Sequence, residues 1–287
     1  SFYKILEGRA SAEADVDSVA SIALAYKHSF GKMFTNQMLS NICSIALYGA
    51  EAEAEIETRK KQTFLSNVVT NLKHYNPTAP NHILPAIADI SAFLYGNESI
   101  DTLIKAALAH YQFEMIHPYE CYNGIVGRII IPMLLWNSDY KAAPYIGLSE
   151  FMYCNKNEYF DKLGSTQWSG SYIHWIKFFV RGIYEATTAN IKRMESFQQI
   201  SEQDKARLNF FKSTTKSTWM VYVYFRNHLI SEINTASEQL GMSFNTVAKS
   251  VKHLLEMGIL QLESEQSRHR RFVYKRLVDV LNEEITI

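Results

Sequence analysis

Histidine, asparagine, glycine and arginine come close together in the segment from His117 to Arg128. A His-Pro pair ends one helical pattern there, and Asn123-Gly124 opens the next. Asparagine and glycine at a helix start leave backbone N–H groups unshielded, and with the helix dipole these groups form an anion site. Arg128, about one turn later, adds a cation, and His117 is placed to act as a general base on an incoming hydroxyl. The same spacing also fits a plain interhelical turn with a buried histidine.

Helical patterns flank this segment on both sides and must hold it in place. Apolar residues recur at spacings of three and four before it and again well after it. They are Leu103, Ile104, Ala107, Leu108 and Tyr111, and then Trp175, Phe178, Phe179 and Ile183. We therefore expect helix through most of the chain up to about residue 200, broken by a proline-containing loop at 76–81. A polar stretch at 195–205 predicts a domain boundary.

The last third of the chain follows a different pattern. After a helix that begins near Phe210, we expect a helix at 235–240, a turn at 241–243 and a second helix at about 244–257. Ser243 is placed to cap that second helix, and Gly258 to end it in a left-handed conformation. Two short strands at 259–262 and 272–274 enclose a polar tip at 263–271. This order predicts a winged helix.

The segment from His117 to Arg128 resembles the signature of the Fic (Fido) family. That signature reads His, any residue, Phe, any residue, Asp or Glu, Gly, Asn, Gly, Arg, two residues, Arg. His117, Asn123, Gly124 and Arg128 match it, and Tyr119 is an aromatic replacement. Flanking segments are also similar to the family's helices, and with the winged helix the resemblance covers most of residues 40–280. These segments are 109–114, 148–149, 155–156, 159–160, Trp168 and 175–179.

The resemblance implies transfer of AMP from a nucleotide, usually ATP with Mg²⁺, to a protein hydroxyl. His117 would deprotonate a Ser, Thr or Tyr of an unidentified target protein, the hydroxyl would attack the α-phosphate, and pyrophosphate would leave. An acidic residue of the signature would hold the metal. The residues implied to contact the nucleotide are Tyr119, Asn123, Gly124, Gly127, Arg128 and Tyr159.

Three residues depart from the signature. Cys121 occupies the position of the metal-binding carboxylate, and Mg²⁺ prefers hard oxygen ligands at about 2.1 Å. Tyr122 replaces a glycine, and Ile125 replaces the first arginine, which removes a charge-assisted contact to phosphate. We therefore expect weakened or altered chemistry. Alternatively, Glu120 replaces the lost metal ligand, or Cys121 serves as a reactive thiol at the helix start.

A second family feature is altered as well. The family's inhibitory helix reads Ser or Thr, three residues, Glu, then Gly or Asn, and Ser44 to Gly49 fits this pattern except that Tyr48 replaces the glutamate. We expect this helix near residues 40–58. Either the inhibitory contact is lost, or Tyr48 and Tyr122 fill the cleft or reshape it for another ligand. The stretch from Gly49 to Pro85 is also short for the family's target-docking flap.

The C-terminal third raises the alternative of DNA binding. From Ser201 to Ile287 it has twelve Lys and Arg against ten Asp and Glu, so the module is only slightly basic. The residues expected to reach DNA in the winged-helix interpretation are Asn245, Lys249, Lys252, Arg268, Arg270 and Arg271. The same fold also serves as a module for binding a protein partner or a second copy of the chain.

Composition sets the outer limits of these expectations. The 287 residues carry no formal net charge, and 47% are hydrophobic. No apolar run reaches the length of a membrane span, and three scattered cysteines fit a reduced cytoplasm. We predict a mainly α fold, with a Fic-like helical domain at 1–200, its core at 85–195, and a winged helix at 201–287. The functional alternatives are an impaired adenylyltransferase and a non-catalytic signalling or transcriptional regulator.

Overall fold

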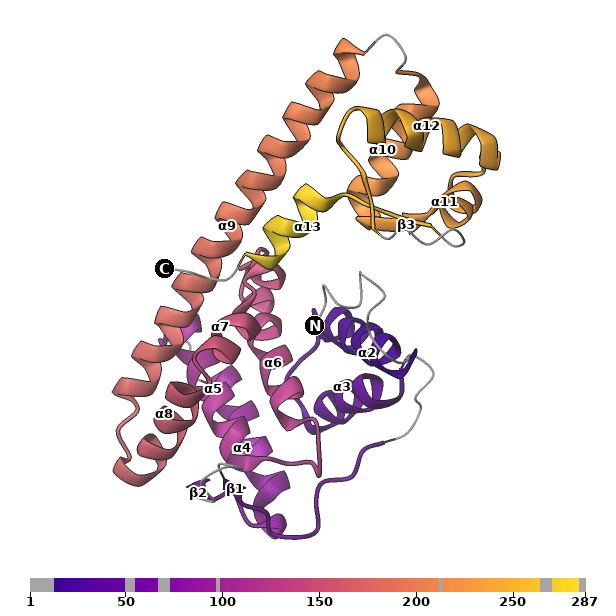
Figure 1. Cartoon of the computed structure of the whole chain (residues 1–287). Coiled ribbons are helices and arrows are strands. Elements are labelled where there is room, and N and C mark those ends of the chain that lie inside the picture. Colours follow the sequence, from indigo (N-terminus) through magenta and orange to yellow (C-terminus); the bar gives the residue numbers. More distant parts are fainter. Residues whose placement is uncertain are drawn as a thin grey trace. The chain divides into compact units, whose positions relative to one another are not determined.

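The computed structural model describes residues 13–49, 55–66, 73–96, 99–211, 214–263 and 270–283. The chain is mainly helical, as predicted (Figure 1). Its described residues divide into two compact units: a first unit of residues 16–190, and a second unit of residues 191–283 with which residues 13–15 are grouped. The division falls ten residues before the predicted boundary, at a point inside a long helix.

Helices α2 to α8 and the first half of α9 make up most of the first unit. Their bounds are α2 Glu13–Ser29, α3 Asn36–Tyr48, α4 Ile83–Gly96, α5 Thr102–Ile116, α6 Asn123–Asn137, α7 Leu148–Cys154, α8 Lys156–Ser169 and α9 Ile173–Phe210. Two 3₁₀ turns, η1 (Pro80–His82) and η2 (Ala143–Tyr145), connect some of them. Strands β1 (Leu65–Ser66) and β2 (Lys73–Tyr75) pair antiparallel. The predicted loop at 76–81 has no helix or strand until Pro80 begins η1.

Helices α5 and α6 pack against each other at the centre of the first unit, on either side of the chemistry-bearing loop. The Asp101 side chain caps α5 by accepting from the Leu103 amide at 2.8 Å. Most side chains of both helices are buried, and the Trp175 indole of α9 donates to the Ala107 carbonyl at 2.8 Å. The ends of the loop are therefore held on a rigid core.

The observed elements do not coincide with two of the sequence-based boundaries. The polar stretch at 195–205 belongs to helix α9, because its polar side chains are largely exposed while Phe197 and Ile200 pack on the second unit's core. The predicted helix at 40–58 corresponds to α3, which begins at Asn36 and ends at Tyr48. Gly49 follows with a φ of 86°, a conformation that favours glycine and stops the helix. Residues 55–59 carry no helix.

The second unit contains three helices after α9, a small sheet and a final helix. They are α10 Lys216–His228, β3 Ile230–Glu232, α11 Ile233–Leu240, α12 Phe244–Glu256, β4 Gln261–Leu262, β5 Arg271–Val273 and α13 Lys275–Asn282. The strands pair antiparallel in the order β3-β5-β4. As predicted, the Ser243 side chain accepts from the Thr246 amide to cap α12, and Gly258 has a φ of 68°. Strand β3 and helix α13 were not predicted.

Candidate functional site

The loop from His117 to Tyr122 is closed by a side chain of the helix that follows it. Asn123 accepts from the Tyr119 amide at 2.9 Å and donates to the Tyr119 carbonyl at 2.7 Å. His117 and Tyr122, at the two ends of the loop, both adopt left-handed backbone conformations, with φ values of 48° and 65°. The Asn123 side chain is therefore fully engaged in holding the turn, and only its backbone amide remains for a ligand.

Arg59 holds the other side of this loop, and its role could not be seen in the sequence. Its side chain is only 2% exposed and donates to the carbonyls of His117 at 2.8 Å and Ile116 at 3.1 Å. It also donates to the carbonyls of Lys61 and Thr78, while its backbone amide donates to Pro118. One buried guanidinium thus joins the extended segment at 55–64 to the end of α5.

His117 has the protonation state that a general base needs. Burial lowers the pKa of its imidazole to about 4, and the nearby Arg59 charge lowers it further. The Glu114 carbonyl opposes this shift without reaching hydrogen-bond geometry, and Nδ1 is buried with no partner. Nε2, by contrast, is not buried and forms no hydrogen bond with the described part of the chain. The ring is therefore neutral at pH 7 and presents one nitrogen to solvent.

Backbone amides and one cation lie together at the start of α6. Within the described residues, no hydrogen bond takes up the amides of Asn123 and Gly124. The Arg128 Nη1 lies 3.1 Å from the position that a Cβ on Gly124 would take. Arg128 forms no ion pair or hydrogen bond with the described part of the chain, and it lines a cavity of about 230 Å³. This arrangement suits an anion.

A buried polar cluster supports Arg128 from the interior. The His110 Nδ1 lies 2.9 Å from the Gly127 carbonyl, and its Nε2 lies 3.0 Å from the Tyr159 hydroxyl. Burial lowers the pKa of His110 to about 3, so the ring is neutral. Burial also raises the pKa of Glu114 to about 7, against the opposing effect of Arg128. The nearby Tyr75 hydroxyl also opposes the rise in the pKa of Glu114. The Tyr75 hydroxyl and the Glu114 Oε1 atom are both buried, and neither of them completes a hydrogen bond.

Three residues expected to contact the nucleotide face the protein interior instead. Tyr119 is 1% exposed, and Tyr159 is engaged with His110. Gly127 is buried because α6 packs closely on α5 there: a Cβ would lie 2.4 Å from Glu114 Oε1. These residues shape the core under the loop, whereas Gly124 and Arg128 are partly exposed.

The metal-ligand position and the inhibitory-helix positions differ in accessibility. Cys121 and Glu120 are both exposed, and no group of three or more metal-ligating side chains occurs in the described part of the chain. On α3, Ser44 is buried and its hydroxyl has no partner. Tyr48 is 66% exposed, which contradicts the interpretation that it fills the cleft. Tyr122 is half-buried and packs against the core.

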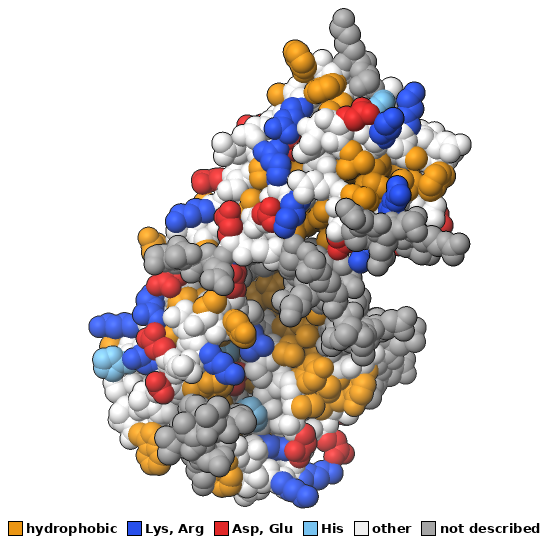
Figure 2. Space-filling model, viewed as in Figure 1, with side chains coloured by type: hydrophobic (Ala, Val, Ile, Leu, Met, Phe, Trp, Pro, Cys, Tyr) orange, Lys and Arg blue, Asp and Glu red, His pale blue; other side chains and the backbone are white. Residues whose placement is uncertain are grey.

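The predicted DNA-contacting residues are only partly available. Asn245, Lys249 and Lys252 are exposed on α12, as expected, and Arg270 is exposed. Arg271 is not free, because its Nε lies 2.8 Å from the Glu263 carboxylate. Arg268 lies outside the described residues. Acidic and basic side chains are interspersed on the visible face (Figure 2), so that face carries no field of a single sign.

Comparison with known proteins places the loop in a family. Residues 34–135, which include α3, α5, the loop and most of α6, match the model of the Fic/DOC family. These residues form a Fic/DOC domain. A Fic family protein from Desulfovibrio desulfuricans G20 has a similar fold, with a TM-score of 0.56 and 15% identity over 92% of this chain and 76% of that one.

Two curated relatives match part of the chain in sequence. They are the protein adenylyltransferases fic-1 of Caenorhabditis briggsae, 28% identical, and of Caenorhabditis elegans, 26% identical, each over 68 residues. The match covers 23% of this chain and only 13% of either relative.

None of the described helices has the length and apolar character needed to cross a membrane.

Proposed function

We propose that the Fic/DOC domain binds the phosphates of a nucleotide, ATP or a related one, at the loop from His117 to Arg128. The observation that carries the proposal is the pair of unbonded amides at Asn123 and Gly124 beneath the unpaired Arg128 guanidinium. Such groups bind phosphate strongly because dipole and charge act together. The likeness to the fic-1 adenylyltransferases supports a nucleotide as the anion.

The proposed reaction is AMP transfer to a protein hydroxyl, impaired or altered relative to the family's usual activity. His117, neutral at pH 7, accepts the proton of the incoming hydroxyl through Nε2. Its low pKa makes it a weak base, and Ile125 offers no charge to the phosphates. Mg²⁺ does not fit the residues present: Cys121 is a thiol and Glu120 is a single carboxylate. We therefore assign no step to a metal.

Calorimetric titration with ATP, with and without Mg²⁺, tests the binding proposal. We expect saturable binding that loses about tenfold or more in affinity in Arg128→Gln, because one charge-assisted contact to phosphate is removed. Binding in the triple variant Cys121→Asp, Tyr122→Gly, Ile125→Arg should be tighter than in the wild type. A flat trace at millimolar ATP, or a triple variant that binds no better, would contradict the proposal.

Labelling separates transfer from binding. If the domain transfers AMP, labelled ATP should modify a protein in an extract, and His117→Ala should abolish the label while preserving ATP affinity. Binding without label in the wild type would leave a nucleotide-binding domain that does not transfer.

A second function is favoured by the order of elements in the second unit. We infer that α10-β3-α11-α12-β4-β5 is a winged helix, which supports a regulator that binds DNA or a protein partner. Asn245 and Lys249 are the exposed residues of α12 that would read a groove. Binding of genomic fragments should weaken steeply with salt and weaken in Lys249→Gln. If the binding of genomic fragments changes neither with salt nor in Lys249→Gln, the result would argue for a protein partner.

A further inference from the structure

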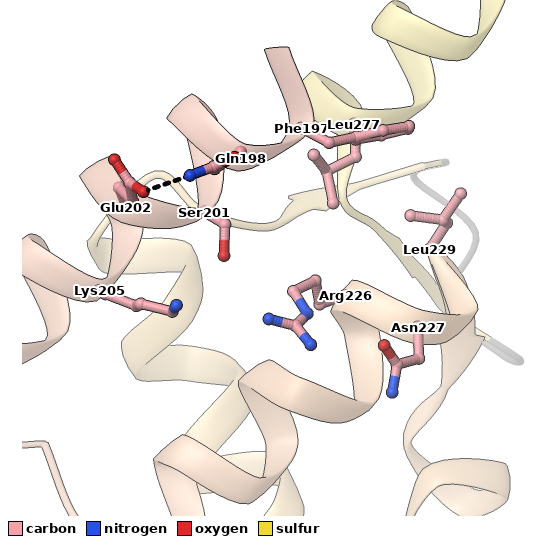
Figure 3. A pocket seen from close by; sticks show the side chains of 9 residues that line it. All are labelled: Phe197, Gln198, Ser201, Glu202, Lys205, Arg226, Asn227, Leu229 and Leu277. Atoms are coloured by element: carbon pink, nitrogen blue, oxygen red, sulfur yellow. Dashed lines mark hydrogen bonds between the residues drawn. The ribbon is translucent and has the colours of Figure 1, made fainter. Parts of the chain in front are cut away.

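A cavity of about 490 Å³ lies in the second unit, between α9, the end of α10 and α13 (Figure 3). It is separate from the Fic/DOC domain, since all its lining residues fall between 197 and 277. Its size lies within the usual range for small-molecule sites. One wall is held in register by a hydrogen bond of 2.7 Å from the Tyr274 amide to the Leu229 carbonyl.

Two cations from different helices point into this cavity. Lys205 of α9 and Arg226 of α10 extend toward the same space, and Ser201 points into it between them (Figure 3). Neither cation has an ion-pair or hydrogen-bond partner in the described part of the chain. Like charges that face one cavity repel each other, and a bound anion relieves that repulsion.

Other charged side chains near this cavity do have partners. On α9, next to Lys205, the buried Asp204 carboxylate accepts from Arg276 at 2.7 Å and lies 3.7 Å from Arg207. Glu202 also lines the cavity, but its carboxylate accepts from the Gln198 amide at 3.0 Å and forms no ion pair with Lys205 or Arg226. The cavity therefore keeps an excess of one positive charge.

The opposite end of the cavity is apolar. Leu277 is 2% exposed there, and Phe197 and Leu229 are partly buried in the core of the unit. In Figure 3 these three side chains gather on one side, away from Lys205. An occupant that uses both ends needs an anionic group and an apolar body.

We propose that this cavity binds a small organic anion, with its carboxylate or phosphate between Lys205 and Arg226 and its apolar part against Phe197, Leu229 and Leu277. The proposal is independent of nucleotide binding at the His117 loop. Because the ligand would join α9 to α10, its binding stabilises the second unit by mass action.

Two anionic probes distinguish the head groups. Calorimetry and thermal unfolding of the full chain would compare 4-phenylbutyrate, phenyl phosphate and the neutral 4-phenylbutanamide. We expect saturable binding and a rise in Tm with at least one anion, and none with the amide. Lys205→Gln and Arg226→Gln should each weaken binding about tenfold or more, since each removes a charge-assisted contact. The better anion identifies the head group.

Matched controls keep the result interpretable. Lys192→Gln removes another exposed lysine of α9 that does not line the cavity, and it should bind like the wild type. Without ligand, Lys205→Gln should keep or raise the wild-type Tm, because it removes a repulsion and leaves the core intact. The proposal is overturned if neither anion binds at about 10 mM or if the neutral amide binds as tightly as the anions. It is also overturned if both cavity variants bind the anions normally, or if Lys205→Gln and Arg226→Gln weaken the binding of nucleic acid and not that of the anions.

Discussion

At the scale of single residues, two glycines of α6 have different tasks. A side chain on Gly127 would meet Glu114 Oε1 at 2.4 Å and the rings of His110 and Phe113 at 3.2 Å. A side chain on Gly124 would meet only the mobile end of Arg128 at 3.1 Å. The first glycine allows two helices to pack closely, and the second leaves room at the proposed anion site.

Gly127→Ala should lower the free energy of unfolding by about 1–3 kcal/mol, because a methyl group is forced into a filled core. Urea unfolding measures the change. Gly124→Ala serves as the comparison: we expect a smaller loss of stability but weaker ATP binding, since Arg128 must move. Equal losses of stability in the two variants would contradict this division of tasks.

Glu114 should make stability depend on pH. Burial raises its pKa from 4.5 to about 7, so between these values the native state holds a proton that the unfolded chain has released. The free energy of unfolding therefore falls as pH rises through this window. Glu114→Gln removes the effect and should gain up to about 3 kcal/mol on the wild type between pH 4.5 and 7.

Urea unfolding of both proteins at several pH values checks this expectation. The contributions of His110 and His117, whose pKa values are lowered by burial, have the opposite sign but are present in both proteins and largely cancel in the difference. A difference that does not change with pH would show that Glu114 is ionised throughout.

At the scale of elements, the loop is shaped by the segment at 55–64 as much as by α5 and α6. Arg59 supplies this connection through carbonyls that lie 57 and 58 residues further along the chain. Its charge also lowers the pKa of His117. One residue outside the motif thus affects both the shape and the basicity of the site.

Arg59→Gln should destabilise the protein by about 2–4 kcal/mol, because buried carbonyls lose their charged donor. The pKa of His117 should rise as the nearby cation is removed, which NMR titration of the imidazole protons measures. Lys60→Gln is the control: Lys60 is 80% exposed and pairs only with Glu57 at 2.6 Å, so neither quantity should change. An unchanged His117 pKa in Arg59→Gln would contradict the proposed charge effect.

What the sequence predicts at this scale follows from local signals. Helix α12 was predicted well because Ser243 caps it and Val247, Val251 and Leu254 mark its buried face. The motif loop was located through His117 and Asn123. Arg59 was missed because its partners are backbone carbonyls, which leave no trace in residue type. Strand β3 has three residues, which is too short to show a period. Helix α13 does have an apolar face, formed by Leu277, Val278 and Val280, but it was missed.

At the scale of the whole molecule, each compact unit has its own core and its own buried carboxyl group. The first contains Glu114, and the second contains Asp204, whose fully buried carboxylate accepts from the Tyr274 hydroxyl and from Arg276. The sequence predicted two domains from a change of pattern. The division between the compact units lies at residues 190 and 191, and helix α9 continues through it without a break, so no turn residues mark it in the sequence.

Asp204→Asn should destabilise the second unit by about 3 kcal/mol, since Arg276 and Tyr274 lose a buried charged partner. Hydrogen exchange measured by mass spectrometry should become faster in α10 to α13 and stay unchanged in α5 and α6. Asp279→Asn, which affects only an exposed pair with Lys275 at 2.7 Å, is the control. Equal acceleration in both units would show that they unfold together.

The left-handed backbone at Tyr122 has a consequence for how this protein can change. A tyrosine pays about 1–2 kcal/mol for a φ of 65°, a conformation that glycine adopts freely. The turn therefore contains a residue that disfavours its conformation, and Asn123 and Arg59 hold it in place. Tyr122→Gly would fit the same backbone, so no segment would need to refold. Substitutions at this loop can therefore be made one at a time, and the effect of each can be measured separately.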